Sequence, residues 1–167
     1  RLITLVGGKW TTFRASAEHL TDDTLAELGR ERAVTTRGMA IGGGRGYPTD
    51  ERARQAWIER HDDGVGRERT GRLLERYGTL AAEVIDAILD DDDDRALATL
   101  PDFSTAELRH LARTEDVERL ADILQRRTDL AFTGRLSREI FEEIADAIAP
   151  VLGWDRSRVA SEVARTM

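Results

Sequence analysis

The chain of 167 residues contains no cysteine, a single lysine, three prolines and few aromatic residues. Without cysteine it has no disulfide bonds, thiolate zinc sites, iron–sulfur clusters or thiol catalysis. His19, His61 and His110 lie far apart and lack the spacing of a metal site. The first residues lack the pattern of a secretory signal, and no run reaches the roughly 18 apolar residues that span a membrane. These absences favour a cytoplasmic protein without a metal centre.

Positive charge is outweighed by negative charge. The net charge is −7 and the isoelectric point is about 5.1. Because nucleic-acid backbones require a basic face, we do not expect DNA or RNA as a partner. Arginine occupies every basic position except Lys9, so this lysine is unusual in the chain.

Lys9 lies in the segment that carries the strongest functional signal. An apolar, β-branched run at residues 2–6 precedes Gly7 and Gly8, and a helical pattern follows from residue 11. This order predicts a strand, a glycine turn and a helix N-terminus. Unpaired N–H groups and the helix dipole favour an anion at such a junction, and glycine permits close approach. The alternative is a tight turn with a surface lysine.

The segment 1–6 finds no neighbouring strand in this sequence. We therefore expect it to be disordered, or paired with a strand of another copy, and we expect the chain to come from a larger protein. Residues 41–48 are rich in glycine and contain neither a phosphate-binding loop motif nor a dinucleotide fingerprint, so we interpret them as a linker. The predicted domains are residues 1–45 and 46–167.

From residue 49 onward, apolar residues recur at helical spacing, which predicts a mainly α domain, a bundle of about six to seven helices. Predicted N-caps are Thr49 or Asp50, Thr79, Ser104, Ser137 and Asp155, and predicted stops are Gly78 and Gly153. Ser104 and Glu107 form a capping-box pattern. The helix after Ser137 carries an apolar face that we expect to be core: Ile140, Phe141, Ile144 and Ile148.

The five carboxylates of Asp90–Asp94 repel one another, which predicts a solvated loop. A calcium loop is the alternative, but the glycine and the later bidentate Glu of an EF-hand are missing.

Three parts of the chain resemble the FAD-dependent sn-glycerol-3-phosphate dehydrogenases. Residues 5–14 are similar to the family's Gly-Gly-Lys-x-Thr-Thr-Tyr-Arg element, with Phe13 in place of the commoner Tyr. Residues 113–115 and 122–128 resemble its Glu…Asp-Val-Leu-x-Arg-Arg-Thr helix, and residues 152–155 with 162–163 resemble its closing helix pair. The resemblance implies a strand–turn–helix remnant of an α/β FAD-binding domain, followed by a helical C-terminal domain.

Site roles follow from the resemblance residue by residue. Gly7, Gly8, Trp10 and Thr11 would face FAD, while Lys9 would bind the phosphate-bearing substrate or stabilise charge beside the flavin ring. The catalytic base would lie upstream. The fragment alone would therefore bind no FAD and would be inactive.

The implied reaction is the oxidation of sn-glycerol 3-phosphate to dihydroxyacetone phosphate by hydride transfer to FAD, in glycerol metabolism. A quinone is the expected electron acceptor, and oxygen, as in the family's oxidases, is the alternative. A homodimer and peripheral contact with the inner face of the cell membrane are also open alternatives. A second hypothesis makes the helical region an interaction module without catalytic residues. We expect Arg126 and Arg127 to stabilise a helix end or anchor the helical domain rather than to catalyse.

Overall fold

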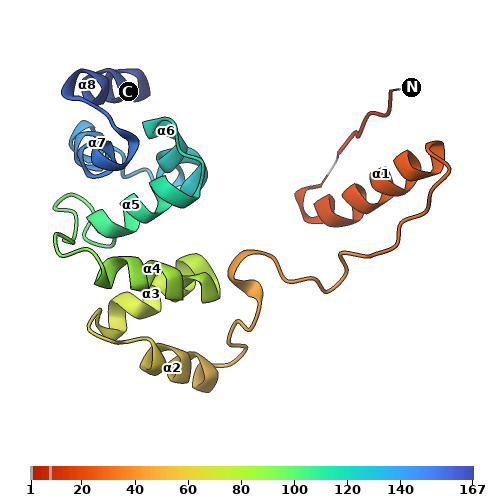
Figure 1. Cartoon of the computed structure of the whole chain (residues 1–167), viewed down its shortest axis with the longest axis horizontal. Coiled ribbons are helices and arrows are strands. Elements are labelled where there is room, and N and C mark those ends of the chain that lie inside the picture. The colour runs from red at the N-terminus through yellow and green to blue at the C-terminus, as the bar shows by residue number, and fades with distance from the viewer. Residues whose placement is uncertain (1, 8) are drawn as a thin grey trace. The chain divides into compact units, whose positions relative to one another are not determined.

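A computed structural model of the chain describes residues 2–7 and 9–167, and nearly all of their regular structure is helical (Figure 1). The chain divides into two compact units, one up to Ile41 and the other from Gly42 onward. The prediction of a mainly α fold with a helical C-terminal domain is confirmed. The predicted boundary between residues 45 and 46 stays a prediction.

The first unit contains one long helix. A 3-10 helix, Trp10–Thr12, runs directly into α1, Phe13–Glu27, and Gly29 ends the helical segment with a positive φ of 66°. The strand expected before it is not formed: residues 2–6 have no regular structure, and Leu2 and Val6 are 91% and 89% exposed. A strand requires a partner for its N–H and C=O groups, and no described segment supplies one.

The second unit begins with three helices around one apolar cluster. These are α2, Glu51–Arg60; α3, Arg67–Tyr77; and α4, Ala81–Leu89. Asp50 caps α2 by accepting a hydrogen bond of 2.8 Å from the N–H of Ala53. The cluster consists of Trp57, Ile58, Leu73, Leu74, Ala81, Val84, Ile85, Ile88 and Ala106.

The remaining helices of this unit surround a second apolar cluster. They are α5, Thr105–Thr114; α6, Leu120–Asp122, which continues as a π-helix, Ile123–Arg127; α7, Arg138–Leu152; and α8, Arg156–Thr166. The apolar face of α7 is buried as predicted. Ser137 and Asp155 are N-caps, and Gly153 ends α7 in the left-handed conformation, which confirms three local predictions.

The glycine-rich stretch is not a free linker. Gly42–Gly44 forms a 3-10 helix that packs on another, Gly78–Leu80. A Cβ atom added to Gly43 would lie 1.9 Å from the carbonyl oxygen of Tyr77. The Thr79 hydroxyl donates to the carbonyl oxygens of Gly43 and Arg45 at 3.0 and 2.9 Å, so its prediction as the N-cap of α4 is wrong.

Candidate functional site

The predicted site residues stand at the start of the helical segment of the first unit. Lys9 has extended backbone and is the N-cap of the 3-10 helix, and the Trp10 side chain is 88% exposed. A Cβ atom added to Gly7 would meet no heavy atom within 4 Å, so its backbone is open to a ligand. Gly8 lies outside the described residues. Their assignment to cofactor or substrate stays a prediction.

The helix start has the electrostatic character that an anion requires. Both the N–H and the hydroxyl of Thr12 donate to the carbonyl oxygen of Lys9, at 3.1 and 2.8 Å, which closes the first turn. The first turns of the 3-10 helix and of α1, all described, contain no acidic side chain. The positive end of the helix dipole is therefore opposed by no local carboxylate. This end and the open glycine backbone fit a phosphate-bearing cofactor.

Arg14 contacts the returning segment. Its Nη1 donates to the carbonyl oxygens of Thr36 and Met39 at 2.8 and 2.7 Å, and so holds the returning segment on α1. The Lys9 side chain, by contrast, has no described polar partner.

A carboxylate cluster holds the returning segment on the other side. Glu18 accepts hydrogen bonds from the N–H of Thr36 and from the hydroxyls of Thr35 and Thr36, the hydroxyl distances being 2.8 Å. The backbone N–H of Thr36, followed by these hydroxyls, lowers the pKa of Glu18 to about 2. Arg32 donates from Nε to Asp22 at 2.7 Å. These contacts position α1 without an apolar core.

Between α1 and this segment lies an apolar groove of about 530 Å³. Its apolar lining includes Phe13, Ala17, Leu25, Val34, Met39 and Ile41. None of the described residues of α1 is buried. The first unit thus presents an apolar surface together with the anion-favouring helix start.

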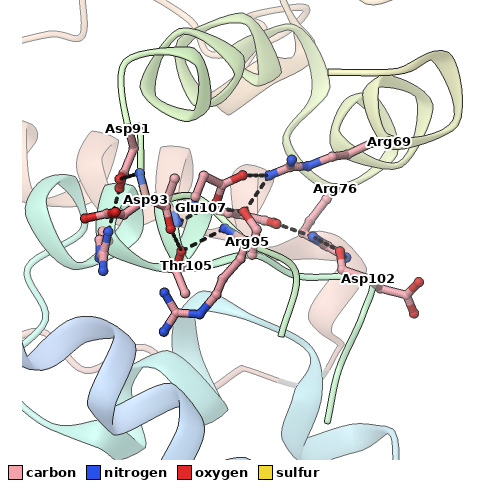
Figure 2. Close-up of polar contacts among 12 residues, drawn as sticks. Arg69, Arg76, Asp91, Asp93, Arg95, Asp102, Thr105 and Glu107 are labelled. Atoms are coloured by element: carbon pink, nitrogen blue, oxygen red, sulfur yellow. Dashed lines mark hydrogen bonds and ion pairs between the residues drawn. The ribbon is translucent and has the colours of Figure 1, made fainter. Parts of the chain in front are cut away.

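In the second unit, a polar network surrounds the N-terminus of α5 (Figure 2). Ser104 caps α5 as predicted, but Glu107 does not complete a capping box. Its carboxylate, 1% exposed, accepts from Arg76 and from the Tyr77 hydroxyl, the latter at 2.7 Å. Burial, followed by the nearby Glu107 charge, raises the pKa of Tyr77. The network joins α3 to α5, and both described partners of the Glu107 carboxylate are side chains of α3.

The run Asp90–Asp94 is only partly solvated, because two of its carboxylates belong to this network (Figure 2). Asp91 pairs with Arg109 at 2.7 Å. Asp94, whose side chain is 9% exposed, pairs with Arg69 at 2.7 Å and accepts from the N–H of Ala106 at 2.9 Å. Burial raises the pKa of Asp94, but these hydrogen bonds outweigh it and the net shift is downward. Two of the five carboxylates are therefore structural, which sequence reasoning missed.

The paired arginines predicted from the family motif line a groove of about 800 Å³ in the second unit. Arg126 pairs with Asp122, and Arg127 Nη1 lies 3.8 Å from Glu115 Oε2. The groove wall carries acidic residues as well as arginines, so charge is compensated locally. This geometry supports a structural role at a helix end, while an anchoring role stays a prediction.

Metal ligation and membrane crossing find no support in the part of the chain that the structure describes. These residues contain no group of three or more His, Asp or Glu side chains arranged to hold a metal ion. No helix in the described ranges is long and apolar enough to cross a membrane.

The chain is similar to several curated proteins. It is 29% identical to "Glycerol-3-phosphate dehydrogenase 2" of Mycobacterium tuberculosis (strain H37Rv), over 99% of this chain and 28% of the relative. It is 29% identical to the glycerol-3-phosphate dehydrogenase of Mycobacterium leprae, over 98% and 28%, and 26% identical to the mitochondrial enzyme of Arabidopsis thaliana, over 97% and 28%. The chain thus spans little more than a quarter of these relatives.

A family model, the C-terminal domain of alpha-glycerophosphate oxidase, matches residues 34–159. The match covers well over half of the chain and includes all helices from α2 to α7. The chain therefore belongs to the family of C-terminal domains of alpha-glycerophosphate oxidase.

Proposed function

We propose that this chain is the C-terminal part of a flavoenzyme that oxidises sn-glycerol 3-phosphate to dihydroxyacetone phosphate. The observation that carries the proposal is the match to glycerol-3-phosphate dehydrogenases over nearly the whole chain, including the Gly-Gly-Lys turn. Since the chain spans 28% of these relatives, most of the active site belongs to the rest of such an enzyme.

Residues of the first unit would hold the cofactor and substrate. FAD, when bound, supplies the acceptor for the hydrogen that leaves the substrate carbon. Gly7 would allow the backbone to approach it, and Trp10 and Thr11 would contact it from the helix start. Lys9 would bind the substrate phosphate, because its ammonium has no described partner and stands at the positive end of the helix.

The acceptor of the electrons is a quinone in this proposal. The curated relatives carry the name dehydrogenase, whereas the family model is named after an oxidase. Oxygen is the competing acceptor. Hydrogen peroxide formation during turnover would favour oxygen over a quinone.

The test uses the full-length product of the reading frame that contains this sequence. We expect purified protein to contain FAD, and glycerol 3-phosphate to bleach it and to support reduction of a quinone analogue. Lys9→Ala should lower kcat/KM about tenfold or more, equivalent to about 1.4 kcal/mol, because it removes a charged contact to the substrate.

The matched control is Arg30→Ala, which removes an exposed cation beyond the other end of α1. Its activity should equal that of the wild type. Flavin reduction by another substrate but not by glycerol 3-phosphate would contradict the proposed reaction. Equal losses in both variants would contradict the specific role of Lys9.

A further inference from the structure

Three arginines converge on one buried carboxylate in the second unit. Glu162 on α8 is 1% exposed, and its Oε1 lies 3.0 Å from Arg158 Nη2, 3.5 Å from Arg119 Nη1 and 3.7 Å from Arg165 Nη1. Because all three nitrogen atoms surround the same oxygen, they also lie close to one another. We call these three residues the arginine cluster.

The charges of this cluster are not balanced. One carboxylate faces three guanidinium groups, which leaves an excess of two positive charges. Asp122 and Asp155 lie beside the cluster, because they accept from the backbone N–H groups of Arg119 and Arg158 at 2.9 and 2.7 Å. Neither they nor Glu118 forms an ion pair with the cluster in the described chain. The other buried carboxylate, Glu107, has one arginine and one tyrosine as partners.

Most hydrogen-bond donors of the cluster have no described partner. Each guanidinium carries five N–H donors. Apart from their ion pairs with Glu162 Oε1, the shortest of which is 3.0 Å, the three side chains have no hydrogen-bond acceptor within the described ranges. The carboxylate is also fixed by its Oε2, which accepts from the N–H of Leu120 at 3.1 Å. Glu162 thus contacts the three guanidinium groups and leaves most of their donors without a described partner.

The cluster is accessible to solvent. The side chains of Arg119, Arg158 and Arg165 are 47%, 40% and 53% exposed. The Arg158 guanidinium also lies 5.8 Å from the ring centroid of Trp154, a contact that restricts its position. Accessible guanidinium groups with donors that lack a described partner and with restricted positions are suited to an oxyanion.

We propose that the arginine cluster binds a phosphate monoester. Such a group carries close to two negative charges at neutral pH and three terminal oxygens, which match the excess charge and the three guanidinium groups. It is a second phosphate site, built from α8 and the residue before α6, and it shares no residue with the Lys9 turn. The ligand is either a free phosphate ester or the headgroup of a phosphatidic acid lipid.

The first experiment measures the binding of inorganic phosphate to this chain by calorimetry, with sodium chloride added to keep ionic strength constant. We expect saturable binding that Arg158→Gln weakens by about tenfold, the loss expected when charge-assisted hydrogen bonds are removed. Arg67→Gln is the matched control, because Arg67 on α3 is also half exposed and ion-paired. It should leave phosphate affinity unchanged.

Glu162→Gln should change phosphate affinity in the opposite direction. The amide keeps the size and an acceptor for the N–H of Leu120 but removes the competing negative charge, so phosphate should bind more tightly than to the wild type. If this variant unfolds more readily, phosphate should raise its melting temperature more than that of the wild type. Weaker binding to Glu162→Gln, or equal binding to wild type and Arg158→Gln, would overturn the proposal, as would no binding at all.

Vesicles distinguish the two sources of the ligand. Sedimentation with phosphatidic acid vesicles, but not with phosphatidylcholine vesicles, and release by inorganic phosphate would identify a lipid headgroup. Binding of phosphate without sedimentation would identify a free ester. Each of these results supports the site, and neither depends on the oxidation of glycerol 3-phosphate.

Discussion

The two units of this chain are stabilised by different kinds of interaction. Up to Ile41, one helix and a returning segment are joined by polar contacts of Arg14, Glu18 and Arg32, and no described residue is buried. From Gly42 onward, two apolar clusters fill the spaces between seven helices. Both units therefore contain helices, but among the described residues only those of the second unit form a core.

This contrast explains where exposed apolar side chains gather. Leu2, Val6, Trp10, Leu28 and Val34 of the first unit are each at least 66% exposed. Contiguous apolar surface, such as the groove between α1 and the returning segment, marks contact sites for other protein or for ligands. It is consistent with the proposal that the first unit belongs to a cofactor domain whose remainder lies elsewhere in a longer protein.

The largest expected effect on stability comes from removing one core side chain of the second unit. Ile144→Ala on α7 deletes a fully buried side chain and should lower the free energy of unfolding by about 2–5 kcal/mol. Leu28→Ala, at a side chain that is 66% exposed in the first unit, should change it by less than about 0.5 kcal/mol. Urea denaturation followed by circular dichroism measures both. Similar losses would show that the first unit has a core after all.

A buried ion pair of the second unit gives the next effect. Glu107→Gln weakens the bonds to Arg76 and Tyr77 and should cost about 1.5–3 kcal/mol, the range for hydrogen bonds to charged groups. The control, Glu68→Gln, breaks a pair with Arg72 whose carboxylate is 91% exposed, and should cost less than about 1 kcal/mol. Equal midpoints in urea for these two variants would contradict the importance of burial.

Glycine substitutions compare the packing of the two units directly. Gly43→Ala would place a Cβ atom against the Tyr77 carbonyl and should cost about 1–3 kcal/mol, the range for overpacking. Gly7→Ala meets open space and should cost less than about 0.5 kcal/mol. Thermal unfolding would measure both changes. A stable Gly43→Ala variant would show that the segment can leave the Gly78–Leu80 turn without loss.

The smallest effect is an acid transition in the first unit. The Thr36 N–H, then the Thr36 and Thr35 hydroxyls, lower the pKa of Glu18 from 4.5 to about 2. Because the pKa of Glu18 is lower in the folded state, its hydrogen bonds stabilise the folded state fully above the unfolded pKa. This stabilisation is lost as pH falls from about 4.5 to about 2. Carbon-13 NMR titration of Glu18 should show a midpoint near 2. A midpoint near 4.5 would mean that these hydrogen bonds are absent in solution.

Local features were predictable because their partners lie close in sequence. The N-caps Asp50, Ser104, Ser137 and Asp155 bind N–H groups three residues ahead, and Gly153 ends a helix through its own φ. The apolar face of α7 followed from helical periodicity alone. The family also followed from the order of short motifs, and the match to the C-terminal domain of alpha-glycerophosphate oxidase confirms it.

Predictions that required distant partners were wrong or incomplete. Glu107 fits a capping box, but an arginine 31 residues away takes its carboxylate. Asp94 looks like part of a solvated run until Arg69 and the N–H of Ala106 enclose it. Thr79 has the chemistry of an N-cap, yet it binds the backbone of the glycine-rich stretch.

The sequence by itself determined the helices, most of their ends and the family, because turns, caps and periodicity are set within a few residues along the chain. Only the tertiary structure decided which charges are buried, how the glycines of residues 42–44 are used, and that three arginines meet at Glu162. Ion pairing and burial depend on side chains brought together from distant positions, and an acidic chain rich in arginine allows many such pairings. Packing of the helices selects among them.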